Sequence, residues 1–82
     1  MSDFERQKYE RRLIVLETDV IPIDLEIQGY RDSLRDLLDP IRPTSELPWK
    51  TIADLAIKGA SRNIDQTAKL NEILRLKELL GK

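Results

Sequence analysis

The four prolines of this 82-residue chain decide where its helices can continue. Proline lacks a backbone N–H, and its ring clashes with the carbonyl four residues earlier, so it suits a helix start and not a helix interior. Three of the four lie together in residues 39–48. They predict a loop that separates an N-terminal part, 1–38, from a C-terminal part, 49–82.

Pro22, the remaining proline, lies in the middle of the N-terminal part. A helix that continued through it would lose the hydrogen bond to the Thr18 carbonyl. We therefore expect a turn at 18–21 and a new helix that begins near Pro22. Residues 1–38 are then predicted to form a helical hairpin.

The segment around Pro22 also alternates apolar and polar residues, which is typical of a half-buried strand. This pattern leaves open an α+β fold with a short β-hairpin around residues 13–28. An isolated two-stranded hairpin is marginally stable in water. Ile23, Ile27 and Tyr30 also follow one another in steps of four and three, as along the seam of a coiled coil. We therefore favour helix over strand.

The C-terminal part predicts two further helices. Gly59 suits the left-handed residue that ends a helix. Asn63 is followed three residues later by Gln66, as in the capping box that begins one. The whole chain, 1–82, is thus predicted to be a single all-α domain, a small helical bundle of about four helices in two hairpins.

Cysteine and histidine are both absent from the chain. Disulfides are thereby excluded, and zinc would lack its usual ligands. The commonest general base and the thiol nucleophile are missing as well. The three glycines are isolated from one another, so no phosphate-binding loop is present. We expect no catalytic residues, no cofactor and no metal site.

Residues 70–80 carry more leucine and isoleucine than one packing stripe can cover, since such a stripe is about 100° wide. So short a chain has a small core, and self-association is the stabilising device left to it. We predict a non-catalytic protein–protein interaction module, a homo-oligomeric adaptor or an inhibitor of a larger partner. It would bind itself and an unidentified protein. The predicted contact residues are Leu70, Ile73, Leu76 and Leu80, with Ile27, Tyr30 and Leu34 as a second stripe.

An alternative hypothesis is a small DNA-binding regulator with a helix-turn-helix at residues 49–80. The predicted turn after Gly59 would place a second helix where arginine and amide side chains could read base edges. Residues 47–82 carry seven basic and four acidic side chains, a net charge of +3. The candidate nucleic-acid contacts are Arg62, Asn63, Gln66 and Lys69.

A third hypothesis concerns Lys8, Tyr9 and Arg12, which lie close together near the N-terminus. A ring for stacking and cations for phosphate would suit a nucleotide or another small ligand. Acidic residues are interleaved with these cations, so ion pairs along an exposed helix surface are the alternative interpretation.

The chain is charged from its first residues, and no apolar run approaches the length of a membrane span. We expect a cytoplasmic protein without membrane contact. Trp49 is the only tryptophan, and it follows Leu47 and Pro48 at a predicted helix start. We expect its ring to be buried, where it would anchor the loop to the C-terminal part.

Overall fold

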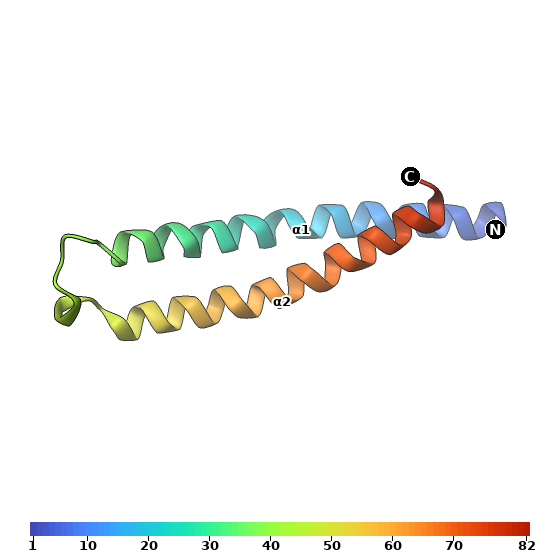
Figure 1. Ribbon diagram of the computed structural model, residues 1–82. Helices are drawn as coiled ribbons and strands as arrows, with labels where there is room; N and C mark the ends of the chain where they lie inside the picture. The colour runs from blue at the N-terminus through green and yellow to red at the C-terminus, as the bar shows by residue number, and fades with distance from the viewer.

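The computed structural model describes all 82 residues and is a hairpin of two long helices (Figure 1). Helix α1 spans Asp3–Leu37, and helix α2 spans Trp49–Leu80. A single 3₁₀ turn, η1 at Thr44–Glu46, lies in the connection. The helices run antiparallel, so the loop is at one end and both termini are at the other. The molecule is a rod with extents of 62 × 16 × 15 Å.

The prediction of four helices in two hairpins is therefore wrong, and so is the α+β alternative, because the chain has two long helices and no strand. Neither internal turn exists. Helix α1 continues through 18–21, and α2 continues through Gly59 and Asn63. Each helix is about twice the length expected, since the signals interpreted as breaks lie inside it.

Pro22 lies within α1 because its side chain is on the outer, exposed side of the helix. The Thr18 carbonyl that it cannot bond also belongs to an exposed residue, where water can satisfy it. On the inner side, Val20 and Ile23 pack toward α2 on either side of the proline. Packing of this inner face holds the helix across the interruption, as tertiary contacts commonly override local propensity.

Gly59 lies inside α2 and does not end it. A Cβ built there would be 4.0 Å from the Tyr30 side chain, so the glycine faces α1 directly. The left-handed residue that ends α2 is Gly81, with φ of 72°. At the other end of the chain, the Ser2 hydroxyl accepts a hydrogen bond from the Glu5 N–H and caps α1.

The two helices meet along a seam in which inward residues recur in steps of four and three, as in a coiled coil. Every one of these residues is buried or half-buried. Those of α1 are Tyr9, Leu13, Leu16, Val20, Ile23, Ile27, Tyr30, Leu34 and Leu37. Those of α2 are Ile52, Leu55, Gly59, Arg62, Gln66, Lys69, Ile73, Leu76 and Leu80.

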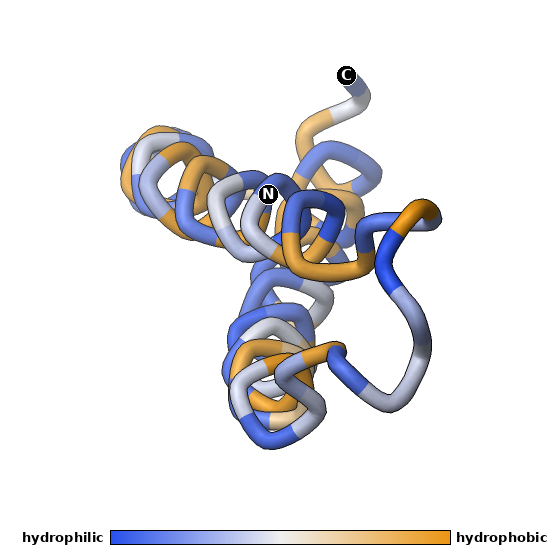
Figure 2. The backbone as a smooth tube through the Cα atoms, turned by 90° about the vertical axis from the view of Figure 1, so that its left-hand side faces the viewer, coloured by the Kyte–Doolittle hydropathy of each residue, from blue (hydrophilic) through white to orange (hydrophobic).

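The apolar core of the seam is small and lies toward the termini. Six side chains in the whole chain are buried, and five of them form one cluster at this end. Apolar residues also occur on more than one side of each helix, as the hydropathy colouring in Figure 2 shows. The cluster consists of Leu13, Leu16, Ile73, Leu76 and Leu80.

Trp49 is not buried, contrary to the expectation from sequence. It is 53% exposed at the start of α2. Its indole N–H donates a hydrogen bond of 2.8 Å to the Thr44 carbonyl. The ring therefore fastens η1 to the first turn of α2 and contributes little to the core.

Leu16 is expected to be the most sensitive core position, because it is 1% exposed. We predict that Leu16→Ala lowers the free energy of unfolding by about 2–5 kcal/mol, through lost burial and the cavity left behind. Urea denaturation followed by circular dichroism measures the change. Ile57→Ala, an exposed position on α2, is the control and should change stability by no more than about 0.5 kcal/mol. Equal losses in the two variants would contradict the assigned core.

Pro22→Ala should stabilise the hairpin, because alanine restores the N–H donor for the Thr18 carbonyl and removes the ring clash. We expect the free energy of unfolding to rise by about 1–3 kcal/mol, since the lost rigidity of the unfolded chain offsets part of the gain. Pro40→Ala is the matched control in the loop, where no helical bond is restored. It should be neutral or slightly destabilising. Thermal melting of both variants provides the measurement, and a destabilised Pro22→Ala would contradict this account.

Candidate interaction surface

The middle of the seam is polar on the α2 side. Arg62, Gln66 and Lys69 occupy inward positions between the apolar residues at the two ends of α2. The α1 residues opposite this segment are mostly apolar, with Ile23 buried and Ile27 half-buried. Side-chain hydrogen bonds and ion pairs therefore replace apolar burial in the middle of the hairpin.

Glu26 and Arg62 form the shortest ion pair between the helices, at 2.6 Å. The Tyr30 hydroxyl donates a second hydrogen bond of 2.7 Å to the same carboxylate. These two donors, Tyr30 first and Arg62 second, lower the pKa of Glu26. The bond also raises the pKa of Tyr30, because ionisation would remove the donated proton. Arg62 additionally contacts Asp65 of its own helix.

A second ion pair between the helices joins Arg12 to both carboxylate oxygens of Glu72, at 3.0 and 3.3 Å. The hydrogen bond from Arg12 lowers the pKa of Glu72, and the pKa of Arg12 is raised for the same reason. On the other side of the seam, Lys77 lies 3.8 Å from Glu17. These pairs flank the apolar cluster and set the register of the two helices.

The residues proposed to contact nucleic acid are all engaged within the hairpin. Arg62 is paired with Glu26, and Lys69 lies 3.1 Å from Asp65. The Gln66 amide donates to Asp24 on α1, and the Asn63 amide donates to Gln66. The helix is continuous through this region, so the turn required by a helix-turn-helix is absent.

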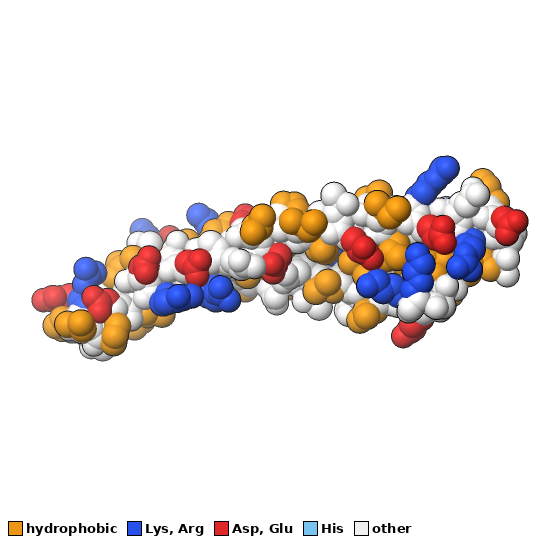
Figure 3. All heavy atoms as spheres, turned by 90° about the horizontal axis from the view of Figure 1, so that it is seen from above, with side chains coloured by type: hydrophobic (Ala, Val, Ile, Leu, Met, Phe, Trp, Pro, Cys, Tyr) orange, Lys and Arg blue, Asp and Glu red, His pale blue; other side chains and the backbone are white.

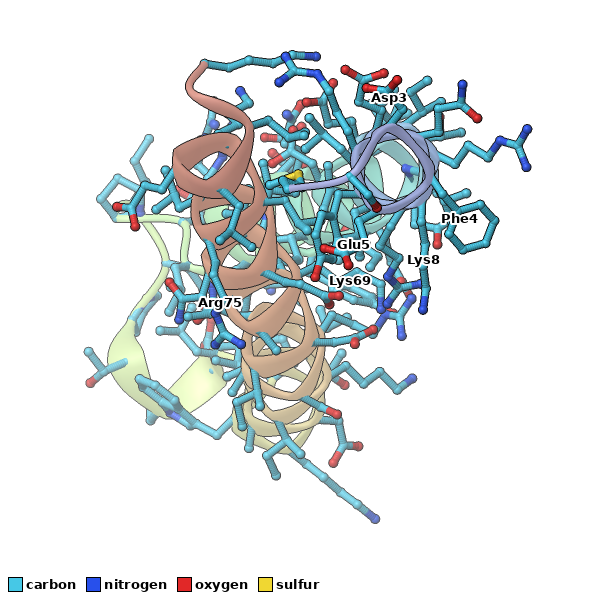
Figure 4. The ribbon with its side chains drawn as sticks, turned by 90° about the vertical axis from the view of Figure 1, so that its right-hand side faces the viewer. Asp3, Phe4, Glu5, Lys8, Lys69 and Arg75 are labelled. Atoms are coloured by element: carbon cyan, nitrogen blue, oxygen red, sulfur yellow. The ribbon has the colours of Figure 1, made fainter.

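The residues proposed for a small ligand do not converge on one point. Tyr9 packs against the apolar cluster, and Arg12 is paired with Glu72. Lys8 lies apart from both, in a shallow depression on the outer side of α1 that it shares with Phe4. Figure 4 shows the Phe4 ring directed away from α2.

Most of the residues proposed for self-association form the hairpin's own seam. Ile73, Leu76 and Leu80 are buried in its core. Ile27, Tyr30 and Leu34 are half-buried between the helices. Of the proposed set, Leu70 alone is exposed. The leucine surplus exists, but Leu74 and Leu79 are the other exposed members.

Two apolar grooves lie along one long side of the hairpin, between α1 and α2. The central groove, of about 340 Å³, is lined by Val20, Ile21, Asp24, Leu25, Gln66 and Leu70. The loop-side groove, of about 330 Å³, is lined by Ile27, Tyr30, Arg31, Leu34, Leu55, Ala56, Gly59 and Ala60.

The two grooves share one side because their lining residues are whole heptads apart. Asp24 and Arg31 differ by seven residues, and Ala56 and Leu70 differ by fourteen. Residues separated by whole heptads point in the same direction from the seam. We call this side the groove face.

Large apolar side chains are exposed on the groove face around the central groove. They come from both helices and are between 44% and 65% exposed. Figure 3 shows apolar side chains exposed between charged ones along the length of the rod. The members of this set are Ile14, Ile21, Leu25, Leu70 and Leu74. Monomeric proteins rarely leave so many large apolar side chains together in water, so the set is the candidate contact surface of the hairpin.

Charge on the groove face changes sign along its length. The half near the termini carries Glu17 and Asp24, the former paired with Lys77. The half near the loop carries Arg31 and Arg35, which share one carboxylate, that of Asp32, at 3.7 and 3.0 Å, so one positive charge is in excess there. The groove face is therefore acidic toward the termini and basic toward the loop. Its large exposed apolar side chains also lie toward the termini.

Comparison with protein-family models, curated protein sequences and solved structures gives no match for this chain. Neither helix contains an apolar stretch long enough to cross a membrane. No three acidic side chains converge on a point where they could hold a metal ion.

The sequence contains the periodic pattern of the α2 seam, but the prediction of two separate helices divides that pattern after Gly59. From Ile52 to Leu80 the steps of three and four are unbroken, but four of the positions are glycine or polar residues. A search for apolar periodicity passes over them. The partners of Arg62 and Gln66 lie on the other helix, at Glu26 and Asp24, and no local pattern reveals such pairs.

The Tyr30 hydroxyl should control the ionisation of Glu26. We predict that Tyr30→Phe raises the pKa of Glu26 toward its ordinary value, because the donor that chiefly lowers it is lost. NMR titration of the Glu26 side-chain carboxyl measures the shift. Tyr9→Phe, which removes a hydroxyl that has no contact with Glu26, is the matched control. An unchanged Glu26 pKa in Tyr30→Phe would refute the assignment.

The lowered pKa of Glu26 also fixes the sign of a pH effect on stability. A carboxyl with a lower pKa in the folded state stabilises the fold above its ordinary pKa, here 4.5, and loses that contribution as pH falls through the folded value. Wild type should therefore exceed Glu26→Gln in free energy of unfolding at neutral pH. Acid denaturation curves of the two proteins measure this difference in the free energy of unfolding. We expect it to shrink as the pH falls below 4.5.

Proposed function

We propose that this hairpin is a non-catalytic protein–protein interaction module whose binding surface is the groove face. The observation that carries the proposal is the exposed apolar set on that face, contributed by both helices and lying beside two apolar grooves. Burying one large apolar side chain gains about 1.5–3 kcal/mol. A partner that covered this set would supply a substantial part of the binding free energy.

The shape of the surface favours a helical partner. A shallow channel between two antiparallel helices accepts the apolar stripe of a further helix, with side chains at steps of three and four as anchors. Ile21, Leu25 and Leu70 would contact such a stripe around the central groove. A module of this kind acts as an adaptor, or as an inhibitor that covers a surface of a larger protein.

The alternative of DNA binding has less support from the contacts. Its candidate cations, Arg62 and Lys69, lie on the inward side of α2 and are neutralised by carboxylates of the hairpin. Phosphate contact would require those pairs to break, and nucleic-acid affinity depends on cations that are free to replace counterions. The continuous helix also removes the docking geometry of a helix-turn-helix.

The absence of catalysis remains part of the proposal. The chain has neither histidine nor cysteine. The carboxyls with lowered pKa values, Glu26 and Glu72, are held by cations of the hairpin itself. Their shifts are explained by the structural pairs, so no further chemical task is needed to account for them.

A photoreactive side chain placed on the groove face tests this function without knowledge of the partner. We predict that benzoylphenylalanine at Leu25, in cells that naturally express the protein, forms a covalent adduct with a protein chain upon irradiation. Benzoylphenylalanine at Leu79, an exposed leucine on the opposite side of the seam, is the matched control and should give little adduct. Denaturing gels and mass spectrometry identify the products. Failure of Leu25 to yield any protein adduct, or equal yields at the two positions, would reject the groove face as the binding surface.

A further inference from the structure

We infer that the groove face is occupied by a second copy of this chain, packed face to face and antiparallel to the first. This inference rests on the proposed function and names the partner of the same surface. A symmetric dimer covers the same patch on both copies with one interface. It leaves no unpaired copy of that patch to which a further chain could bind. Three properties of the hairpin support a second copy: its exposed area, its shape and its charge.

The hairpin exposes more surface than a compact protein of its size. A globular monomer of 9.5 kDa exposes about 5,000 Å². This chain exposes 6262 Å², which is about 1,200 Å² more. A stable protein–protein interface covers about 800 Å² on each partner. One interface of this size along the groove face would therefore remove about two thirds of the excess.

The groove face is complementary to itself when one copy is reversed. Toward the termini it carries large side chains such as Ile21, Leu70 and Leu74. Toward the loop it carries a groove lined partly by small residues, Ala56 and Ala60 among them. In an antiparallel pair the large half of each copy meets the small half of the other. A parallel pair would crowd the large side chains at one end and leave space at the other.

Charge on the groove face supports the same orientation and sets its register. Reversal of one copy brings the acidic half, with Glu17 and Asp24, toward the partner's basic half, with Arg31 and Arg35. Pairing Asp24, whose carboxylate accepts hydrogen bonds from neutral amides of the hairpin, with the partner's Arg31 places the two-fold axis near residues 27–28 of α1. Gln28, exposed on this face, then lies close to its own counterpart.

The solution mass tests the second copy. Sedimentation equilibrium at tens of micromolar should give twice the chain mass of 9.5 kDa. Ile21→Glu combined with Leu70→Glu should weaken the dimer by about 100-fold or more, because two charges enter an apolar contact. The control is Val15→Glu combined with Leu79→Glu, two similarly exposed positions, at 46% and 48%, on the opposite side of the seam. This control should remain a dimer.

Single-cysteine variants test the orientation, since the chain has no cysteine of its own. In the antiparallel dimer, Gln28→Cys lies near the axis and should form an interchain disulfide under mild oxidation. Ile14→Cys, far from the axis, should not. A dimer in which Gln28→Cys fails to cross-link, or Ile14→Cys links as readily, would overturn this arrangement.

The outcomes separate this inference from the proposed function. A wild-type monomer mass overturns the second copy. The groove face then remains an interaction surface if Leu25 is still cross-linked to a different protein in cells, and both conclusions fail if it is not. The groove-face variant could lose its helical structure together with its dimer mass, while the control keeps both. That result supports the second copy, because folding then depends on dimerisation.

Discussion

The packing of α1 against α2 along a seam of alternating three- and four-residue steps is the constraint on which the molecule depends. Neither helix would be stable alone in water, since most helical stability in proteins comes from packing of an apolar face. The seam explains how Pro22 and Gly59 are tolerated, because each has packed residues on both sides. The seam also contains the buried leucines of α2, so only the exposed leucines remain available for contact with another chain.

The limits of sequence-based prediction follow from the same seam. Helical content and the break around residues 39–48 depend on local chemistry, which can be recognised in a sequence. The number of helices was wrong, because the cost of Pro22 inside a helix is local while its compensation comes from α2. Interpreting Gly59 as a helix end failed for a similar reason: only the structure shows that Tyr30 packs against it.

The surplus of leucine could be recognised in the sequence, but the exposed members of it could not. The excess of leucine over one stripe was visible at residues 70–80, and it indicated a second contact surface. Which leucines were in excess could not be decided, since that depends on the register of α2 against α1. The register places Leu76 and Leu80 inside and Leu74 outside. The ion pairs that help to set it join residues far apart in the chain, such as Arg12 and Glu72.

The uneven distribution of the core along the rod has a consequence for how the hairpin opens. The buried cluster joins Leu13 and Leu16 to Leu80, so the most stable contacts link residues that are farthest apart in sequence. Folding must close a loop of most of the chain before these contacts form, and that closure carries an entropic cost that grows with loop length. The half nearest the loop has seam contacts that are only half-buried, so it should fray first and exchange its amide hydrogens fastest. The hairpin therefore unfolds first beside the loop, while the helix ends that carry the termini stay packed together.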